Sequence, residues 1–242
     1  MSSRKRNPII AALDVSTLEQ AACLARKIRP YVGAFKIGKE LFVSEGPAAV
    51  RVLAEVGLPI FLDLKFHDIP NTVARAVAAA VRLGVRMLTL HCFGGFAMLR
   101  AAKEAAQTTA ATLGKPAPLL LGVTVLTSLD EQDLHTLGVM GSLETQVLRL
   151  AQIGERAGLD GLVCSPKELP LLRPKFPRMQ LVTPGIRPSS NLPISQDDQK
   201  RTFTPAEAIR KGADWIVIGR PIFTASDPAT AAQKIWKEIQ NL

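Results

Sequence analysis

The sequence contains few cysteines and few aromatic residues, and each scarcity argues against a class of protein. Three cysteines occur in 242 residues, widely spaced and without a Cys-x-x-Cys pair. Neither a disulfide framework nor a zinc site is therefore expected, and a reducing, cytoplasmic location fits best. Aromatic residues amount to 5%, with one tyrosine and two tryptophans, which leaves little to stack against nucleic-acid bases.

Long apolar runs are also missing. A membrane-spanning helix needs about 20 apolar residues, whereas the longest run, over residues 118–126, is interrupted by Gly122 and Thr124. The basic first residues resemble the start of a signal peptide, but the apolar run that follows ends at Asp14 and is too short for export. We expect a soluble protein that has no membrane partner.

The formal net charge of +9 indicates an anionic partner. After the first six residues, lysine and arginine are scattered along the chain rather than clustered. This pattern favours a small anionic substrate over nucleic acid, although a basic RNA-binding protein built on a barrel remains an alternative.

Several common catalytic motifs do not occur. The sequence has no Gly-x-Gly-x-x-Gly, no Walker loop and no Gly-x-Ser-x-Gly, so dinucleotide, nucleoside triphosphate and serine-hydrolase chemistry lack support. His67, His91 and His135 have no metal-ligand partner at helical or hairpin spacing. We expect neither a metal ion nor an organic cofactor.

Short apolar runs alternate with helix-forming segments from one end of the chain to the other, without a linker. This order predicts a single-domain (β/α)8 TIM barrel over residues 1–242, with a doubly wound open sheet as the alternative. Helices are expected over about 17–28 and 40–56. The expected strands are Ile9–Leu13, Ala34–Ile37, Ile60–Leu64, Met87–Leu90, Leu119–Val125, Gly161–Cys164, Gln180–Val182 and Trp215–Ile218.

Polar residues and glycines gather where the predicted strands end. Asp14, Lys36 and His91 mark the first, second and fourth strands. In barrels this face holds the active site, and the loops after strands seven and eight commonly bind phosphate. Those loops carry Gly185, Arg187, Gly219 and Arg220. Glycine lets backbone N–H groups approach an anion and arginine matches phosphate oxygens, so we predict a phosphorylated substrate. The loop over residues 184–202 is the longest and is a candidate lid.

The stretch from Phe61 to Thr72, FLDLKFHDIPNT, concentrates charge at the end of the third strand. Side chains in a strand alternate, so Asp63 and Lys65 are expected to point the same way. A surface ion pair is the simplest explanation of these two residues. Asp68 is expected in the turn that leads into a helix beginning near Pro70.

The string DLKFHDIPNTV resembles the signature of the orotidine 5′-monophosphate decarboxylase family. The resemblance extends along the chain through ALDV, FKIG, VTVLTS, TPGIRP and VIGRP, in family order. It implies decarboxylation of orotidine 5′-monophosphate to uridine 5′-monophosphate, the last step of pyrimidine nucleotide synthesis, without metal or cofactor.

The resemblance also implies roles for individual residues. Lys65 would be the proton donor, with Lys36, Asp63 and Asp68 as its charged partners. Asp68 would come from the other subunit of a homodimer. The substrate-binding residues would be Asp14, Lys36, Asp63, Ile69, Thr72, Thr127, Arg187, Gln199, Gly219 and Arg220, with Gln196 competing with Gln199 for one position.

A Mg²⁺-dependent sugar-phosphate decarboxylase or aldolase of a sister group is the alternative function. It resembles this sequence at Asp63, Lys65 and Asp68. In that group the second strand is expected to carry an acidic metal ligand, whereas here the position is Lys36, whose charge would repel a metal ion.

Overall fold

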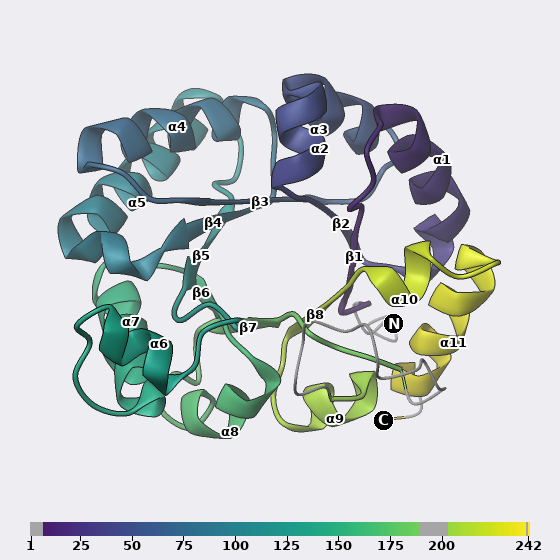
Figure 1. Ribbon diagram of the computed structural model, residues 1–242. Helices are drawn as coiled ribbons and strands as arrows, with labels where there is room; N and C mark the ends of the chain where they lie inside the picture. The colour runs from purple at the N-terminus through teal and green to yellow at the C-terminus, as the bar shows by residue number, and fades with distance from the viewer. Residues whose placement is uncertain (1–6, 189–202, 241) are drawn as a thin grey trace, which may run out of the picture.

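Eight short strands form a closed parallel barrel in the computed structural model, which describes residues 7–188, 203–240 and 242 (Figure 1). The strands are β1 (Ile9–Ala12), β2 (Ala34–Ile37), β3 (Ile60–Phe66), β4 (Met87–His91), β5 (Leu119–Val123), β6 (Gly161–Val163), β7 (Gln180–Thr183) and β8 (Trp215–Ile218). Each strand pairs with the next, and β1 also pairs with β8, which closes the sheet. The predicted (β/α)8 barrel is confirmed, and the open sheet is excluded.

Helices form a ring around the barrel (Figure 1), and the longer ones pack on it through an apolar stripe. In α4, for example, the buried residues are Val73, Val77, Ala80 and Val81, which share one face because of the helical period. The helices are α1 (Leu18–Ile28), α2 (Lys39–Glu45), α3 (Pro47–Ala54), α4 (Pro70–Arg82), α5 (Gly95–Thr112), α6 (Glu131–Thr136), α7 (Leu143–Arg156), α8 (Leu169–Leu172), α9 (Pro205–Arg210), α10 (Arg220–Phe223) and α11 (Pro228–Gln240). Short 3-10 turns cover Arg29–Tyr31, Cys92–Gly94 and Pro166–Glu168.

The prediction of one helix over residues 40–56 is wrong. Two helices, α2 and α3, meet at Gly46, whose φ of 59° lies in the left-handed region that glycine tolerates. Pro47 lacks the N–H that an unbroken helix needs and instead starts α3. Two strand ends also differ by two residues, because β3 continues to Phe66 and β5 stops at Val123. The ends of β1, β4, β6 and β7 differ from the prediction by one residue each.

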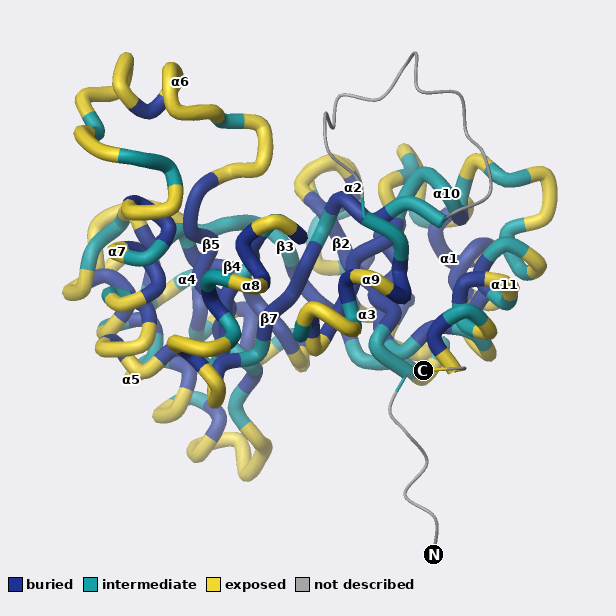
Figure 2. The backbone as a smooth tube through the Cα atoms, turned by 90° about the horizontal axis from the view of Figure 1, so that it is seen from below, coloured by how far each residue is buried: buried dark blue, intermediate teal, exposed yellow. Residues whose placement is uncertain are grey.

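Alternation along the strands separates two apolar layers. Ile10, Phe61, Met87 and Trp215 belong to a cluster inside the barrel, whereas their neighbours in sequence pack between barrel and helices. Figure 2 shows the strands as a continuous buried centre. Continuing the inward-facing series toward the strand ends leads from Ala34 to Lys36, from Phe61 to Asp63 and from Met87 to Thr89.

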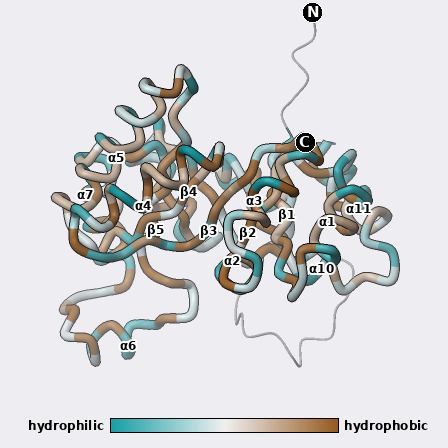
Figure 3. The backbone as a smooth tube through the Cα atoms, turned by 90° about the horizontal axis from the view of Figure 1, so that it is seen from above, coloured by the Kyte–Doolittle hydropathy of each residue, from teal (hydrophilic) through white to brown (hydrophobic). Residues whose placement is uncertain are grey.

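The segment between β5 and α7 projects from the barrel and carries α6 at its tip (Figures 2 and 3). It leaves the carboxyl end of β5, which is the end where the inward-facing polar residues lie. Leu137 and Met140 in this segment are 67% and 78% exposed. The carboxyl end of the barrel is therefore flanked by a protruding arm with apolar side chains.

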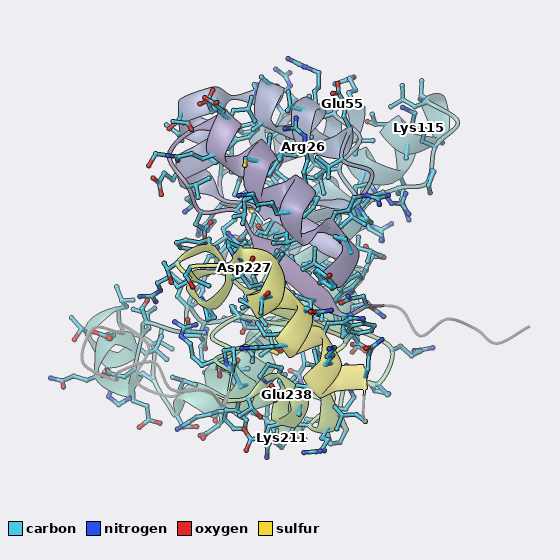
Figure 4. All side chains as sticks on the ribbon, turned by 90° about the vertical axis from the view of Figure 1, so that its right-hand side faces the viewer. Arg26, Glu55, Lys115, Lys211, Asp227 and Glu238 are labelled. Atoms are coloured by element: carbon cyan, nitrogen blue, oxygen red, sulfur yellow. The ribbon has the colours of Figure 1, made fainter. Side chains whose placement is uncertain are left out.

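Charged side chains are spread over the outer helices. Figure 4 shows basic and acidic side chains interspersed there, among them Arg26 and Glu55 in one half of the view and Lys211 and Glu238 in the other. Within the described ranges, no helix has the length and apolar content required to span a membrane.

Candidate active site

Four charged side chains of alternating sign lie in a row at the carboxyl ends of β1, β2 and β3. Lys36 Nζ is 2.9 Å from Asp14 Oδ1 and 3.9 Å from Asp63 Oδ2. Lys65 Nζ donates to both oxygens of Asp63, at 2.9 Å each. The structure therefore brings together Asp14, Lys36, Asp63 and Lys65, in an order where each charge lies beside an opposite one.

Lys36 is the most enclosed member of the row. Its residue is only 8% exposed, and it points into the barrel from a strand whose other residues are apolar. A buried ammonium group requires paired charges, which Asp14 and Asp63 supply. Gly38 leaves room for this pairing, since a Cβ there would lie 2.9 Å from Asp14 Oδ1 and 3.0 Å from Lys36 Nζ.

The convergence of Asp63 and Lys65 does not come from regular strand alternation. Lys65 has a φ of 53°, and among the described residues it is the single non-glycine with positive φ. Pairing of β3 with β4 shifts at this point, because Leu62 pairs with Leu88 but Phe66 pairs with Leu90. The ion pair is present, but an irregularity in the strand creates it.

Thr89 is a site residue that the sequence analysis missed. It is fully buried on β4, and its hydroxyl accepts from the Lys65 backbone N–H at 2.8 Å and donates to Asp63 Oδ1 at 3.0 Å. A threonine inside an apolar strand gives no sequence signal of its own, since threonine is common in strands. Only the neighbouring strand reveals what it contacts.

Asp68, Ile69 and Thr72 stay outside this row. All three are exposed, in the turn after β3 and at the start of α4. The Asp68 carboxylate accepts from the backbone N–H of Ile69 at 2.6 Å. Within the part of this chain that the structure describes, no ion pair joins Asp68 to Lys65.

The predicted phosphate-binding residues come from β7, β8 and their loops. Gly219 follows β8 and lies beside the end of β1, because a Cβ at Gly219 would lie 3.4 Å from Ala12 Cβ and 3.6 Å from Asp14 Oδ2. Arg220 follows as the first residue of α10. The backbone N–H of Arg187 donates to the carbonyl of Phe203 at 3.0 Å. Gln199 and its competitor Gln196 lie outside the described residues.

Thr127 lines a cavity of about 950 Å³. Ser165, Glu168 and Pro184 share this cavity, which places it at the ends of β5, β6 and β7. Glu168 is 7% exposed and accepts from the Ser165 backbone N–H at 3.0 Å. Burial raises the pKa of the Glu168 carboxyl to about 7, although the bonds from Ser165 act in the opposite direction.

His91 lies next to the charged row at the end of β4. Its ring stacks on His67 with centroids 5.4 Å apart, and its Nδ1 atom is buried without a hydrogen-bond partner. Burial, with the nearby charges of His67 and Lys65, lowers the pKa of His91 to about 4, so the ring is neutral near pH 7. Among the residues that the structure places, no group of three His, Cys, Asp or Glu could hold a metal ion.

Comparison with known proteins assigns the family. The family model described as "Orotidine 5'-phosphate decarboxylase / HUMPS family" matches residues 7–235, nearly the whole chain. The chain belongs to this orotidine 5′-phosphate decarboxylase / HUMPS family. Because the description names two groups, family membership alone does not identify the substrate of this member.

Individual relatives carry the decarboxylase name. An orotidine 5′-phosphate decarboxylase of Pseudomonas paraeruginosa is 50% identical over 97% of this chain and 98% of its own length. One from Moorella thermoacetica is also 50% identical, over 97% of this chain and 93% of its own. A crystal structure of orotidine 5′-phosphate decarboxylase from Lactobacillus acidophilus has a TM-score of 0.84 and 37% identity, covering 96% of this chain and 99% of that one.

Proposed function

We propose that this protein is an orotidine 5′-monophosphate decarboxylase, which converts its substrate to uridine 5′-monophosphate and CO₂ in pyrimidine nucleotide synthesis. The row Asp14–Lys36–Asp63–Lys65 is the observation that supports the proposal best. Full-length relatives of 50% identity that bear the decarboxylase name support it independently.

Lys65 carries the central chemical step. Breaking the bond between ring carbon and carboxylate releases CO₂ and leaves the electron pair on the ring carbon. That carbanion needs a fixed cation beside it and then a proton, and the Lys65 ammonium supplies both. Water then returns a proton to Lys65.

Asp63 and Lys36 hold this ammonium in place. Asp63 accepts from Lys65 Nζ through both oxygens, so the lysine side chain is oriented before substrate binds. Lys36, between Asp14 and Asp63, offsets the negative charge that accumulates there. Asp63 would also oppose the substrate carboxylate, because like charges repel, which disfavours the ground state relative to the transition state.

The remaining substrate groups match residues in the loops and helix starts at the carboxyl end of the barrel. Asp14 and Thr72 bind the ribose and Thr127 the pyrimidine, while Ile69 lines the site. Arg187, Gln199, Gly219 and Arg220 hold the phosphate. The adjacency of Gly219 to Asp14 supports this division, because ribose and phosphate are neighbours in the nucleotide.

The active enzyme is a homodimer in which each subunit lends Asp68 to its partner's site. The exposure of Asp68 and Thr72 supports this assembly. Apolar side chains are also exposed on helices that follow β2, β3 and β4: Val43 in α2 is 82%, Ile69 at the start of α4 66% and Phe96 in α5 47% exposed. Burial of these side chains against a second subunit would remove their apolar surface from water.

The protein works without a metal ion and in the cytoplasm. Lys36 places a positive charge where the magnesium-dependent group is expected to have a metal ligand. The free thiols of Cys23, Cys92 and Cys164 suit a reducing compartment.

A spectroscopic assay tests the proposal. Purified protein mixed with orotidine 5′-monophosphate should deplete the ultraviolet absorbance of the substrate and form uridine 5′-monophosphate, and exhaustive EDTA treatment should leave the rate unchanged. Loss of activity with EDTA that Mg²⁺ restores would instead assign the protein to the sugar-phosphate group. Absence of orotidine 5′-monophosphate turnover under both conditions would contradict the proposed function.

A further inference from the structure

We propose that Thr89 is a positioning residue: its single buried hydroxyl fixes both the carboxylate of Asp63 and the left-handed backbone of Lys65. The kinetic part of this inference rests on the proposed function. The Thr89 hydroxyl is bonded neither to the Lys65 ammonium nor to the ring carbon that receives the proton. Its influence on the reaction would therefore act through Asp63 and Lys65, which it holds in place.

Strand β3 is irregular opposite Thr89 of β4. Between the paired residues Leu62–Leu88 and Phe66–Leu90, β3 contributes Asp63, Leu64 and Lys65, whereas β4 contributes only Thr89. The extra residues of β3 cannot all find partners in the ladder, as in a β-bulge. Thr89 is the residue that faces this gap.

The Thr89 hydroxyl replaces a hydrogen bond that the irregular strand leaves unmade. With the ladder interrupted, the Lys65 N–H loses a backbone partner, and an N–H that is shielded from water without a partner destabilises the folded state. The Thr89 hydroxyl accepts from it at 2.8 Å, replacing the missing carbonyl. The same oxygen donates its proton to Asp63 Oδ1 at 3.0 Å. The hydroxyl therefore acts both as a hydrogen-bond donor and as an acceptor within the charged row.

The surroundings of Thr89 shield its hydroxyl from water. Thr89 is fully buried and faces the barrel interior, above Met87 in the same strand. Water cannot readily take over either hydrogen bond at a position with no exposed surface. A residue of the same shape without the hydroxyl would leave Asp63 and Lys65 less restrained.

The matched substitutions are Thr89→Val, which keeps the shape and removes the hydroxyl, and Thr89→Ser, which keeps the hydroxyl. We expect Thr89→Val to lower kcat at least tenfold, with the KM for orotidine 5′-monophosphate and the affinity for uridine 5′-monophosphate within about threefold of wild type. Thr89→Ser should restore kcat to within about threefold. Thr183→Val is the control, since Thr183 is equally buried at a strand end, and among the described residues its hydroxyl is paired with Cys164 Sγ, at 3.9 Å, and not with a member of the charged row.

A purely structural role would give a different pattern. Equal losses in the valine and serine variants, a KM that rises in step with the fall in kcat, or a valine variant within threefold of wild type would each overturn the proposal. If Thr89→Val does not fold, as judged by circular dichroism, Thr89→Ala replaces it in the same comparison.

A crystal structure of the valine variant gives a readout that does not depend on the substrate. The bidentate contact between Lys65 Nζ and Asp63 should be lost or lengthened beyond hydrogen-bond distance. An unchanged contact would overturn the positioning role even if the protein proved to act on another substrate. Wild-type turnover tests the proposed function, and the variants compared with wild type test Thr89.

Discussion

At the scale of the residue, Lys65 adopts a backbone conformation that costs a non-glycine residue roughly 1–2 kcal/mol. Its φ is 53°, and contacts of its own N–H and ammonium with Thr89 and Asp63 hold it there. Strain of this kind persists where surrounding structure over-determines it, which is common at functional sites. The backbone thus orients the side chain to which we assign proton donation.

Lys65→Ala should abolish turnover while leaving nucleotide binding largely intact, because a proton donor acts mainly in the transition state. We expect kcat to fall by roughly 10³-fold or more, with little change in the affinity for uridine 5′-monophosphate. Lys115→Ala, an exposed lysine outside the site (Figure 4), serves as the control. A kcat within about tenfold of wild type, or ~1.4 kcal/mol, would contradict the assigned role.

Arg220→Ala should mainly impair use of the phosphorylated substrate, since binding energy from a remote phosphate assists the reacting ring. The comparison is kcat/KM for orotidine 5′-monophosphate and for orotidine, which lacks the phosphate, in wild type and variant. Orotidine should be a very poor substrate for both proteins. The substitution should lower kcat/KM much less for orotidine than for orotidine 5′-monophosphate. Arg26→Ala, on the outer face of α1, is the control. An equal loss with the two substrates would place Arg220 outside the phosphate site.

At the scale of the element, two helix starts have the same capping box, but the pKa values of their glutamates shift in opposite directions. Glu168 caps the 3-10 turn after β6 and is buried, whereas Glu207 caps α9 and is exposed. Burial raises the pKa of Glu168 to about 7, while hydrogen bonds from Thr204 lower the pKa of Glu207. The two carboxyls should therefore affect the pH dependence of stability with opposite sign.

Glu168→Gln measures this effect. The unfolded carboxyl loses its proton near pH 4.5 and the folded one near pH 7, so wild-type stability falls across that window. The variant lacks this loss, and its melting temperature relative to wild type should rise between pH 4.5 and 7 and then level off. The rise corresponds to at most ~3 kcal/mol. In Glu207→Gln the relative melting temperature should instead fall as pH rises through the range just below 4.5. A flat difference for Glu168→Gln would mean that its carboxyl titrates normally.

The sequence predicted elements better than the contacts between them. Apolar runs gave all eight strands, and polar residues at their ends predicted that Asp14, Lys36, Asp63 and Lys65 lie at one end of the barrel, but not the order of their ion pairs. Thr89 was missed because its role depends on the register between β3 and β4, which a single sequence does not specify. The break at Gly46 and Pro47 was local information that the helix prediction did not use.

At the scale of the whole molecule, the proposed site extends beyond one chain. Asp68 and Thr72 lie exposed at the rim, together with apolar Ile69, and not in the charged row. In a two-fold dimer each subunit would give and receive the same residues.

Mixing two inactive variants tests this arrangement. A heterodimer of Lys65→Ala and Asp68→Ala chains would contain one doubly altered site and one intact site. After subunit exchange in an equal mixture, activity should recover to about a quarter of wild type, since half of the dimers are mixed and each has one working site. Mass spectrometry reports the exchange, and unmixed variants are the controls. Exchange without recovery would mean that Asp68 acts within its own chain.

The closure of the barrel between β1 and β8 also bears on synthesis of the protein by the ribosome. Gly219 lies beside Asp14, so one side of the proposed site joins the start of the chain to a segment translated near its end. At ~5–20 residues per second, β1 would wait for roughly 10–40 s with one edge unpaired. A nascent chain therefore cannot complete the proposed site until β8 has been translated, and any shorter fragment lacks the strand that pairs with this edge of β1.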